Sequence, residues 1–396
     1  MQRVEAAIRK HTLIAMLLIL SISAPCAQAQ VNPNANERTK NIYRYINALK
    51  NQVQPNRLLL GQHATSRLEV YKGEALDLSQ EWLTWITYWD ELYWGLAKEY
   101  NNDQHLALVG IDFGVNQPAE DPTGNPPEAN SNSKPRYATR DAETFAGQGC
   151  IVTASWHLNN PWTGNDCKDR TKVDLKSLLP GGTHRAKWLS RLDVIAAELQ
   201  ILQAKERTVL WRPFHEMNAD WFWWGKVPPT DFKTLWIDMY QYFTLTKHLN
   251  NLIWVYTPYN IDAEDRLPYN TYYPGNEYVD IVGVDVYDDV TYEGDQVKDP
   301  LEIHFYESLK AIAPSKPLIC GELGPNEIKA GSNWNHFLDQ LQTKYPEIVS
   351  ALAWNDWFDD EAEGDNKWTY KSIVKNKHAG VLKHPYVITR EELPQF

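Results

Sequence analysis

Residues 208–225, TVLWRPFHEMNADWFWWG, carry the clearest indication of the fold. The stretch opens as a continuous apolar run without polar alternation, which is expected of a strand buried on both faces of a parallel sheet. The run ends at His215 and Glu216, and three tryptophans follow almost at once. We therefore predict a buried strand with ionisable and aromatic side chains at its carboxyl end.

Seven further runs of this kind occur along the chain, separated by stretches long enough for helices. The eight runs occupy residues 57–62, 106–113, 151–157, 208–215, 252–258, 280–287, 317–322 and 349–357. The spacer at 185–205 has one apolar helical stripe, formed by Trp188, Leu189, Leu192, Ile195, Ala196, Leu199 and Leu202. Eight strand–helix units predict an α/β fold, a (β/α)8 TIM barrel. A doubly wound sheet is the alternative, but residues 61–64 lack the glycine-rich phosphate turn that usually follows its first strand.

Residues 1–29 differ in composition from the rest of the chain. Three basic residues precede an apolar run at 13–20, and small residues follow up to Ala29. This order is typical of a signal peptide cleaved after Ala29. We expect a secreted or periplasmic protein with a single catalytic domain over residues 30–396. A lipoprotein anchor at Cys26 is less favoured, because the neighbours of this cysteine fit such a signal poorly.

The charge of the chain narrows the classes of partner. The formal charge of −12 becomes −14 without the leader, which carries three basic residues and one acidic residue. An acidic surface disfavours nucleic acid, whereas a neutral polysaccharide meets no such repulsion. No segment approaches the ~20 apolar residues of a membrane-spanning helix. We expect a soluble monomer.

Three cysteines follow the leader, at Cys150, Cys167 and Cys320. An odd number leaves at least one thiol free. A strand-like run of roughly 23 Å separates the first two, whereas bridged Cα atoms lie ~4.4–6.8 Å apart. We expect no bridge between these two unless the loop folds far back.

Polar and aromatic side chains gather where the eight runs end. They are Gln62, His63, Asp112, Trp156, His157, His215, Glu216, Tyr256, Asp285, Tyr287, Glu322, Trp354, Asp356 and Trp357. In a barrel this end carries the active site, which is built by the loops that follow the strands. Long loops at 114–137, 158–182 and 257–275 would shape it.

Glu216 and Glu322 are the candidates for acid–base chemistry. A carboxylic acid needs an apolar setting to keep its proton near neutral pH, and Glu216 adjoins aromatic faces of the kind that grip sugar rings. The alternatives are a structural ion pair between Glu216 and Arg212, and a structural salt bridge at Glu322. Their positions at the ends of buried strands disfavour both. Glycines flanking Glu322 would let a substrate approach the backbone.

The histidines and tryptophans also have structural alternatives. His157 alone could merely bond the nearby backbone, and His215 should point away from Glu216 if both lie in a strand, as an orienting or wall residue. Trp221 is the better stacking candidate, whereas the next two indoles could pack under the loop. No metal is expected, because the second histidine of an H-E-x-x-H helix and any C-x-x-C spacing are absent.

Three motifs resemble those of glycoside hydrolase family 26, best known for β-mannanases. Residues 211–218 with 221–225 look like its acid/base motif, residues 155–161 like its third-strand motif, and residues 321–324 like its nucleophile motif. They occur in the family order, and the likeness extends over essentially the whole chain after the leader. The resemblance implies a (β/α)8 barrel and hydrolysis with retention. Glu216 would be the acid/base on strand four and Glu322 the nucleophile on strand seven.

The same resemblance implies the substrate-binding residues, which are His157, His215, Trp221, Tyr287 and Trp354. Tyr287 would orient Glu322, and Trp354 would form the platform beneath the sugar at the cleaved bond. After Trp354 comes Asn355-Asp356-Trp357, where some mannanases of the family carry an arginine. This departure leaves the choice between endo and exo cleavage open.

Together these features predict a secreted endo-β-1,4-mannanase that acts on mannan, glucomannan or galactomannan without metal or cofactor. Retention requires carboxyl groups about 5–5.5 Å apart, and the aromatic wall should raise the pKa of Glu216. One alternative is a same-fold retaining enzyme acting on β-1,3-xylan or mixed-linkage β-glucan. The others are an exo-acting mannobiohydrolase and a non-catalytic glycan-binding protein that keeps the aromatic platform.

Overall fold

The computed structural model describes residues 30–50, 56–63, 104–114, 134–261, 267–287, 291–293, 296–299, 301–324, 334–354, 357–358, 368–369 and 381–396. The strands are β1 (Leu58–His63), β2 (Leu108–Asp112), β3 (Ile151–Trp156), β4 (Val209–Pro213), β5 (Leu252–Tyr256), β6 (Ile281–Tyr287), β7 (Thr291–Glu293), β8 (Gln296–Asp299), β9 (Leu318–Gly324), β10 (Ile348–Ala353), β11 (Trp357–Phe358), β12 (Trp368–Thr369) and β13 (Val387–Ile388). The helices are α1 (Glu37–Leu49), α3 (Lys134–Gly147), α4 (Arg185–Ala204), α5 (Pro229–Gln241), α6 (Tyr306–Ile312) and α7 (Trp334–Lys344), with short 3-10 helices η1 (Leu175–Leu178), η4 (Val381–Lys383) and η5 (Arg390–Glu392) and a π-helical turn η2 (Tyr242–Thr246). The expected signal peptide, Cys26, Asn355 and Asp356 lie outside the described residues.

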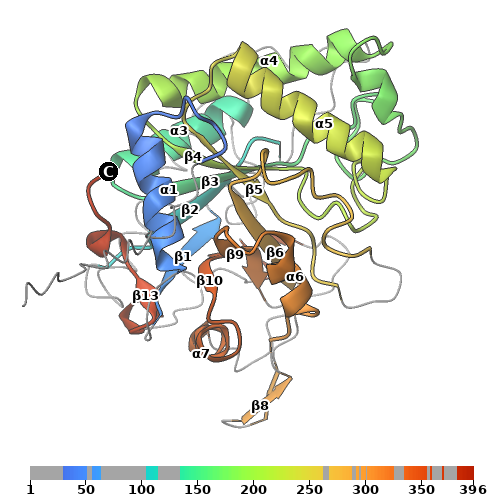
Figure 1. Ribbon diagram of the computed structural model, residues 1–396. Coiled ribbons are helices and arrows are strands. Elements are labelled where there is room, and N and C mark those ends of the chain that lie inside the picture. The colour runs from blue at the N-terminus through green and yellow to red at the C-terminus, as the bar shows by residue number, and fades with distance from the viewer. Residues whose placement is uncertain are drawn as a thin grey trace, which may run out of the picture.

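The eight expected strands form one closed parallel barrel (Figure 1). Their order is β10-β9-β6-β5-β4-β3-β2-β1, and β10 pairs in parallel with β1 to close the ring. The seventh and eighth expected strands are therefore β9 and β10. The antiparallel pairs β7–β8 and β11–β12 form separate two-stranded sheets. The prediction of a (β/α)8 TIM barrel is confirmed.

Several of the expected strands are shorter than predicted, and two of these differences fall where site residues follow the strand, at the ends of β4 and β10. β4 ends at Pro213, because Phe214 and Glu216 take left-handed backbone angles, with φ of 52° and 56°. β10 ends at Ala353, so Trp357 belongs to the separate strand β11. The first difference matters for the site, because side-chain alternation along a strand does not extend to residues 215 and 216.

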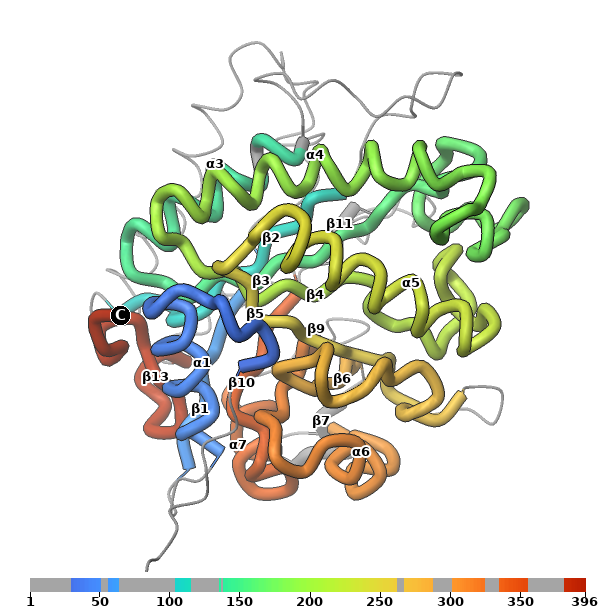
Figure 2. Tube along the Cα trace, turned by 45° about the horizontal axis from the view of Figure 1, so that its top comes forward, coloured from blue at the N-terminus to red at the C-terminus, as the bar shows by residue number. Residues whose placement is uncertain are grey.

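Helices α3, α4 and α5 run side by side on one side of the barrel, with α6 and α7 on the other (Figure 2). The apolar stripe predicted at 185–205 is buried in α4, except that Leu189 is half-buried. Two charged residues are buried in the same helix. Glu198 pairs with Arg136 of α3 at 3.0 Å, and Arg191 donates to the carbonyl of Asn159 at 2.9 Å. The second contact ties α4 to the loop that follows β3.

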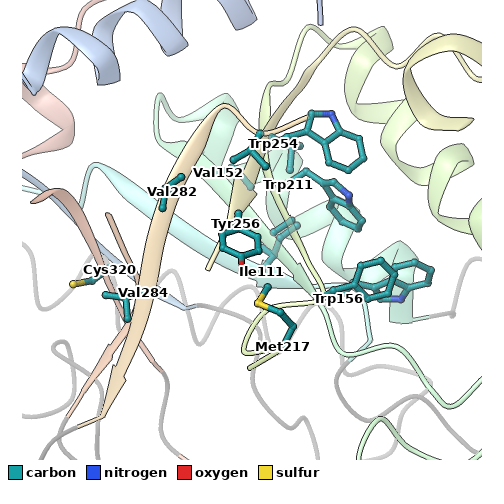
Figure 3. Close-up of a cluster of buried hydrophobic side chains, with 14 of the residues drawn as sticks. Ile111, Val152, Trp156, Trp211, Met217, Trp254, Tyr256, Val282, Val284 and Cys320 are labelled. Carbon is teal, nitrogen blue, oxygen red and sulfur yellow. The ribbon is translucent and has the colours of Figure 1, made fainter. Parts of the chain in front are cut away.

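Tryptophans fill the space between the barrel and these helices (Figure 3). Trp156, Trp211 and Trp254 lie on the adjacent strands β3, β4 and β5, and all three are buried. Trp156 stacks on Trp188 of α4 with ring centroids 6.2 Å apart, and Trp254 meets Trp236 of α5 at 6.1 Å. Large apolar rings of this kind supply much of the burial energy of a core. These ring contacts pack the strands beneath the site against α4 and α5.

The amino end of the barrel is closed by α1 and by the end of the chain. Ile42 and Ile46 of α1 join the same core cluster as strand residues such as Leu210 and Ile253. The final strand β13 pairs with the start of β1. Among the described residues, no helix combines the length and apolar character needed to cross a bilayer.

No disulfide joins the three described cysteines, as expected for the first two. Cys150 and Cys320 are buried, and Cys167 is half-buried in the loop after β3.

Candidate active site

The seven residues singled out from the sequence lie at one end of the barrel. His157 follows β3, and His215, Glu216 and Trp221 follow β4. Tyr287 ends β6, Glu322 lies near the end of β9, and Trp354 directly follows β10. This is the carboxyl end of the strands, where TIM barrels place their active sites.

Glu216 sits on a tight turn rather than on a strand. Its backbone N–H donates to the carbonyl of Thr257 after β5 at 2.8 Å, which holds the left-handed residue in place. Non-glycine residues in this conformation cost on the order of 1 kcal/mol, and such strain concentrates at functional sites. The turn also brings His215 into the same site, 3.7 Å from Glu322, so the premise that His215 and Glu216 lie in one strand is wrong and the alternation expected from it does not apply.

The side chain of Glu216 is buried against an indole. The residue is 6% exposed, and Trp221 Nε1 donates to its Oε2 at 2.5 Å. Burial and the neighbouring charge of Glu322 raise the pKa of Glu216 to about 8. The hydrogen bond from Trp221 opposes this rise. Glu216 therefore keeps its proton near neutral pH, as the sequence predicted.

Glu322 has a different set of partners. Arg212 of β4 donates to its Oε1, and the Tyr287 hydroxyl donates to its Oε2 at 2.6 Å. Arg212 also donates to Asp285 at 2.8 Å and is 1% exposed. Although burial opposes it, the charges of Asp285 and Glu322 raise the pKa of Arg212 above its ordinary value. The alternative ion pair of Arg212 with Glu216 does not form; Arg212 binds Glu322 instead.

Glu216, Asp285 and Glu322 form a tight carboxylate group. One oxygen from each lies within 4.8 Å of the others. This spacing would suit a cation, but Arg212 already donates to both Asp285 and Glu322, so a metal ion would meet a fixed positive charge. An oxygen of Glu216 within 4.8 Å of an oxygen of Glu322 is compatible with the carboxyl separation of roughly 5–5.5 Å in retaining glycosidases, and is shorter than the roughly 6.5–9.5 Å of inverting ones.

A β-bulge at Gly321 sets the position of Glu322. The register between β6 and β9 shifts, so that Val284 faces Cys320 but Asp285 faces Glu322. A side chain at Gly321 would place its Cβ 2.5 Å from Asp285 Oδ1 and 2.6 Å from Thr257 Cγ2. The glycine therefore makes room for protein atoms, and not for a substrate as expected. Bulges are common next to active sites because they re-aim a side chain.

Two histidines lie beside Glu322. His157 Nδ1 is 2.6 Å from Asp112 Oδ2, and its Nε2 is 3.1 Å from His215 Nε2. The same His215 nitrogen is 3.7 Å from Glu322 Oε1. His157 is thus part of a polar chain that reaches Glu322, and its role is not confined to the nearby backbone.

Aromatic rings surround the carboxylates. Trp354 is half-buried and packs on His63 with ring centroids 4.2 Å apart. Trp221 is also half-buried and meets Tyr259 edge to face at 4.8 Å, and Tyr259 stacks on Tyr287 at 6.5 Å. The indoles Trp223 and Trp224 are fully buried, as their structural alternative required.

Sequence reasoning placed Asp112, Asp285 and His63 among the polar strand ends but gave them no role in the site. It missed Tyr259 and the pairing of Arg212 with Glu322. The signal for Arg212 was a charged residue inside an apolar run, since a buried guanidinium must have an acidic partner. Which acid it meets depends on the pairing of β4 with strands more than 70 residues away.

Comparison with known proteins agrees with this arrangement. The family model described as Glycosyl hydrolase family 26 matches residues 101–392. The chain belongs to this family. It is thus a glycoside hydrolase, in line with the sequence motifs.

Individual relatives share much of the chain. It is similar to a mannan endo-1,4-beta-mannosidase A and B of Caldalkalibacillus mannanilyticus, with 33% identity over 82% of this chain, and it spans 58% of the length of that relative. A mannan endo-1,4-beta-mannosidase of Bacillus subtilis is 29% identical, over 95% of this chain and 94% of that protein. A solved structure of a Bacillus subtilis mannanase covers 93% of this chain and 97% of its own, with 26% identity and a TM-score of 0.67.

Proposed function

We propose that this protein is an endo-β-1,4-mannanase that hydrolyses mannan, glucomannan or galactomannan with retention of configuration. The observation that carries the proposal is the pair of buried carboxyl groups of Glu216 and Glu322, which have oxygens within 4.8 Å of each other. Their hydrogen-bond donors differ, since Trp221 donates to Glu216 and Tyr287 donates to Glu322. The relatives named mannan endo-1,4-beta-mannosidase support the choice of substrate.

The reaction uses the two carboxyl groups in turn. Glu322 attacks the anomeric carbon while the protonated Glu216 gives its proton to the departing oxygen, so the glycosidic bond breaks and a glycosyl ester forms on Glu322. Glu216, now ionised, then removes a proton from water, which attacks the same carbon and releases Glu322. Arg212 and Tyr287 hold the attacking carboxylate in a fixed orientation.

The remaining predicted residues would bind sugar around this centre. Trp354 offers a half-buried ring on the side of the histidines, and Trp221 offers one beside Glu216, where the leaving sugar departs. Flat aromatic faces of this kind suit the apolar faces of pyranose rings. We further propose that residues 1–29 direct export, so that the enzyme meets its polymer outside the cytoplasm.

Product analysis tests the proposal and separates it from the same-fold alternatives. Wild type and Glu322→Ala proteins are incubated with linear mannan, galactomannan, β-1,3-xylan and lichenan, and products are followed with time. Early oligosaccharides of mixed length from mannan are expected from wild type, with a loss of at least about 10⁴-fold in the variant. Mannobiose alone would indicate exo cleavage, and equal activity of the folded variant would refute the role of Glu322.

A further inference from the structure

Asp112, at the end of β2, is bonded to His157 at two points. Its Oδ2 accepts from His157 Nδ1 at 2.6 Å and from the Ser155 hydroxyl at 2.5 Å. Its Oδ1 accepts from the backbone N–H of Gly114 at 2.6 Å and of His157 at 3.2 Å. The carboxylate is fully buried. Asp112 therefore fixes both the ring and the backbone of His157.

The backbone around Asp112 is packed directly against His157. A Cβ on Gly114 would lie 2.2 Å from the carbonyl oxygen of His157 and 2.9 Å from its nitrogen. The loop after β2 and the loop after β3 thus touch without an intervening side chain. The ring of His157 has little freedom to leave Asp112.

The hydrogen bond between the two histidines requires a proton on one of the two Nε2 atoms. The Nε2 atoms of His157 and His215 are 3.1 Å apart, so one of them must donate and the other accept. Asp112 accepts at Nδ1 of His157, which fixes a proton on that nitrogen. If His157 is neutral, the shared proton is carried by His215. If His157 is an imidazolium, His157 donates and His215 accepts with its lone pair.

The charged groups around the pair favour the second arrangement. His157 faces Asp112, Glu322 and Arg212; burial lowers its pKa, but Asp112 and Glu322 leave that pKa above its ordinary value. For His215, burial and then the charges of Arg212 and His157 hold the pKa well below its ordinary value, and His63 acts in the same sense while Asp112 opposes it. A proton taken up by this pair is therefore held by His157 in preference to His215.

We propose that Asp112 is a positioning residue that holds His157 as an imidazolium donor to His215. The lone pair of His215 Nε2 then faces His157, and this nitrogen carries no proton to donate to Glu322 Oε1, 3.7 Å away. Arg212 and Tyr287 already donate to Glu322, and a third donor would stabilise the carboxylate further and weaken it as a nucleophile. This consequence rests on the proposed role of Glu322.

Asp112→Asn tests the inference, because it keeps the shape of the side chain and removes its charge. Histidine ring signals in NMR report the titration of His157 in the protein without substrate. We expect the Asp112→Asn protein to titrate His157 at lower pH, by at least about one unit, and to lose about tenfold in kcat, the equivalent of one pKa unit, with a smaller change in KM. Asp112→Glu, which keeps the charge, should restore part of both.

Asp280→Asn is the matched control. Asp280 is also buried and also accepts backbone N–H groups, from Val31 and Trp254, but it lies at the opposite end of the barrel. This variant should lower Tm without moving the His157 titration. Ser155→Ala removes a donor that competes for Asp112 Oδ2, and it should shift the titration the other way, to higher pH.

A folded Asp112→Asn protein whose His157 titrates as in wild type would overturn the inference, as would an unmoved titration in Ser155→Ala if the first variant does not fold. The NMR measurement is independent of substrate. If the His157 titration shifts as expected in the variant but the wild-type protein does not hydrolyse mannan, the result counts against the proposed function and not against the positioning of His157.

Discussion

At the scale of single residues, the site gives two glutamates different chemistry by giving them different partners. Glu216 lies against the indole of Trp221, which donates to it, whereas Glu322 receives donors from a guanidinium and a phenol. Pairs of acids whose surroundings separate their protonation states mark acid and nucleophile roles. The assignment therefore follows from neighbours that can be changed one at a time.

Trp221→Phe should move the pH dependence of the enzyme. The indole N–H stabilises ionised Glu216, so its loss raises a pKa that already stands at about 8. Because the acid must be protonated to act, the fall in kcat/KM on the alkaline side should shift to higher pH. A pH profile on mannan measures this shift. Trp223→Phe removes an indole N–H that donates to the Leu158 carbonyl and not to Glu216, so it should leave the alkaline limb in place, and an equal shift in both variants would refute the argument.

The location of site residues was predictable from the sequence where it depends on position along one strand. Glu216 and Glu322 each follow an apolar run, and this was enough to select them. Contacts between strands determine which acids Arg212 binds, and they also determine the hydrogen bond between Asp112 and His157. A single sequence does not contain those registers, because many pairings satisfy the same hydrophobic pattern.

At the scale of elements, the site is built from the turns that end the strands. The loops after β3 and β4 are tied together, since Arg170 donates to the carbonyls of Asp220 and Gly225 and Trp223 N donates to the carbonyl of Cys167. Strand existence was predicted well because apolar runs are long and distinct. The early end of β4 and the bulge at Gly321 were not, because positive φ at Phe214 and Glu216 is imposed by tertiary contacts.

Gly114→Ala should disrupt the contact between the loop after β2 and the loop after β3, which lies at the backbone of His157. The added Cβ would lie 2.2 Å from the His157 carbonyl oxygen, so the loop after β2 must move. We expect a loss of about 3 kcal/mol in the free energy of unfolding, together with reduced activity. Gly147→Ala is the control, because its Cβ would meet only Arg207 at 3.6 Å. Denaturant unfolding of both proteins measures the difference, and similar stabilities would contradict the reported packing.

At the scale of the whole molecule, barrel closure brings distant residues to one end. The paired residues Leu59 of β1 and Ser350 of β10 are 291 positions apart in the sequence, yet the two strands lie side by side, and Trp354 packs on His63. The barrel was predictable because eight buried strands with helical spacers admit few other architectures. The added strand β13 was not predicted, since its two residues are too short to give a periodic signal.

Removal of residues 384–396 tests the contribution of this terminal segment. Tyr386, Val387 and Ile388 are buried against the start of β1, and Arg57 pairs with Glu392 at 2.8 Å. Loss of three buried apolar side chains should cost on the order of 5 kcal/mol, comparable to the stability of many domains. Thermal unfolding should show a much lower Tm or no cooperative transition. A Tm like that of the full chain would contradict this role.

The central claim is that Glu216 and Glu322 act as acid/base and nucleophile across a spacing that gives retention. It is tested most directly by proton NMR of the anomeric signals during the first turnovers on a mannooligosaccharide, before the products mutarotate. The separation of the carboxylates, within 4.8 Å, predicts that the β-anomer is formed first. Initial formation of the α-anomer would mean inversion and would contradict the assignment of Glu322.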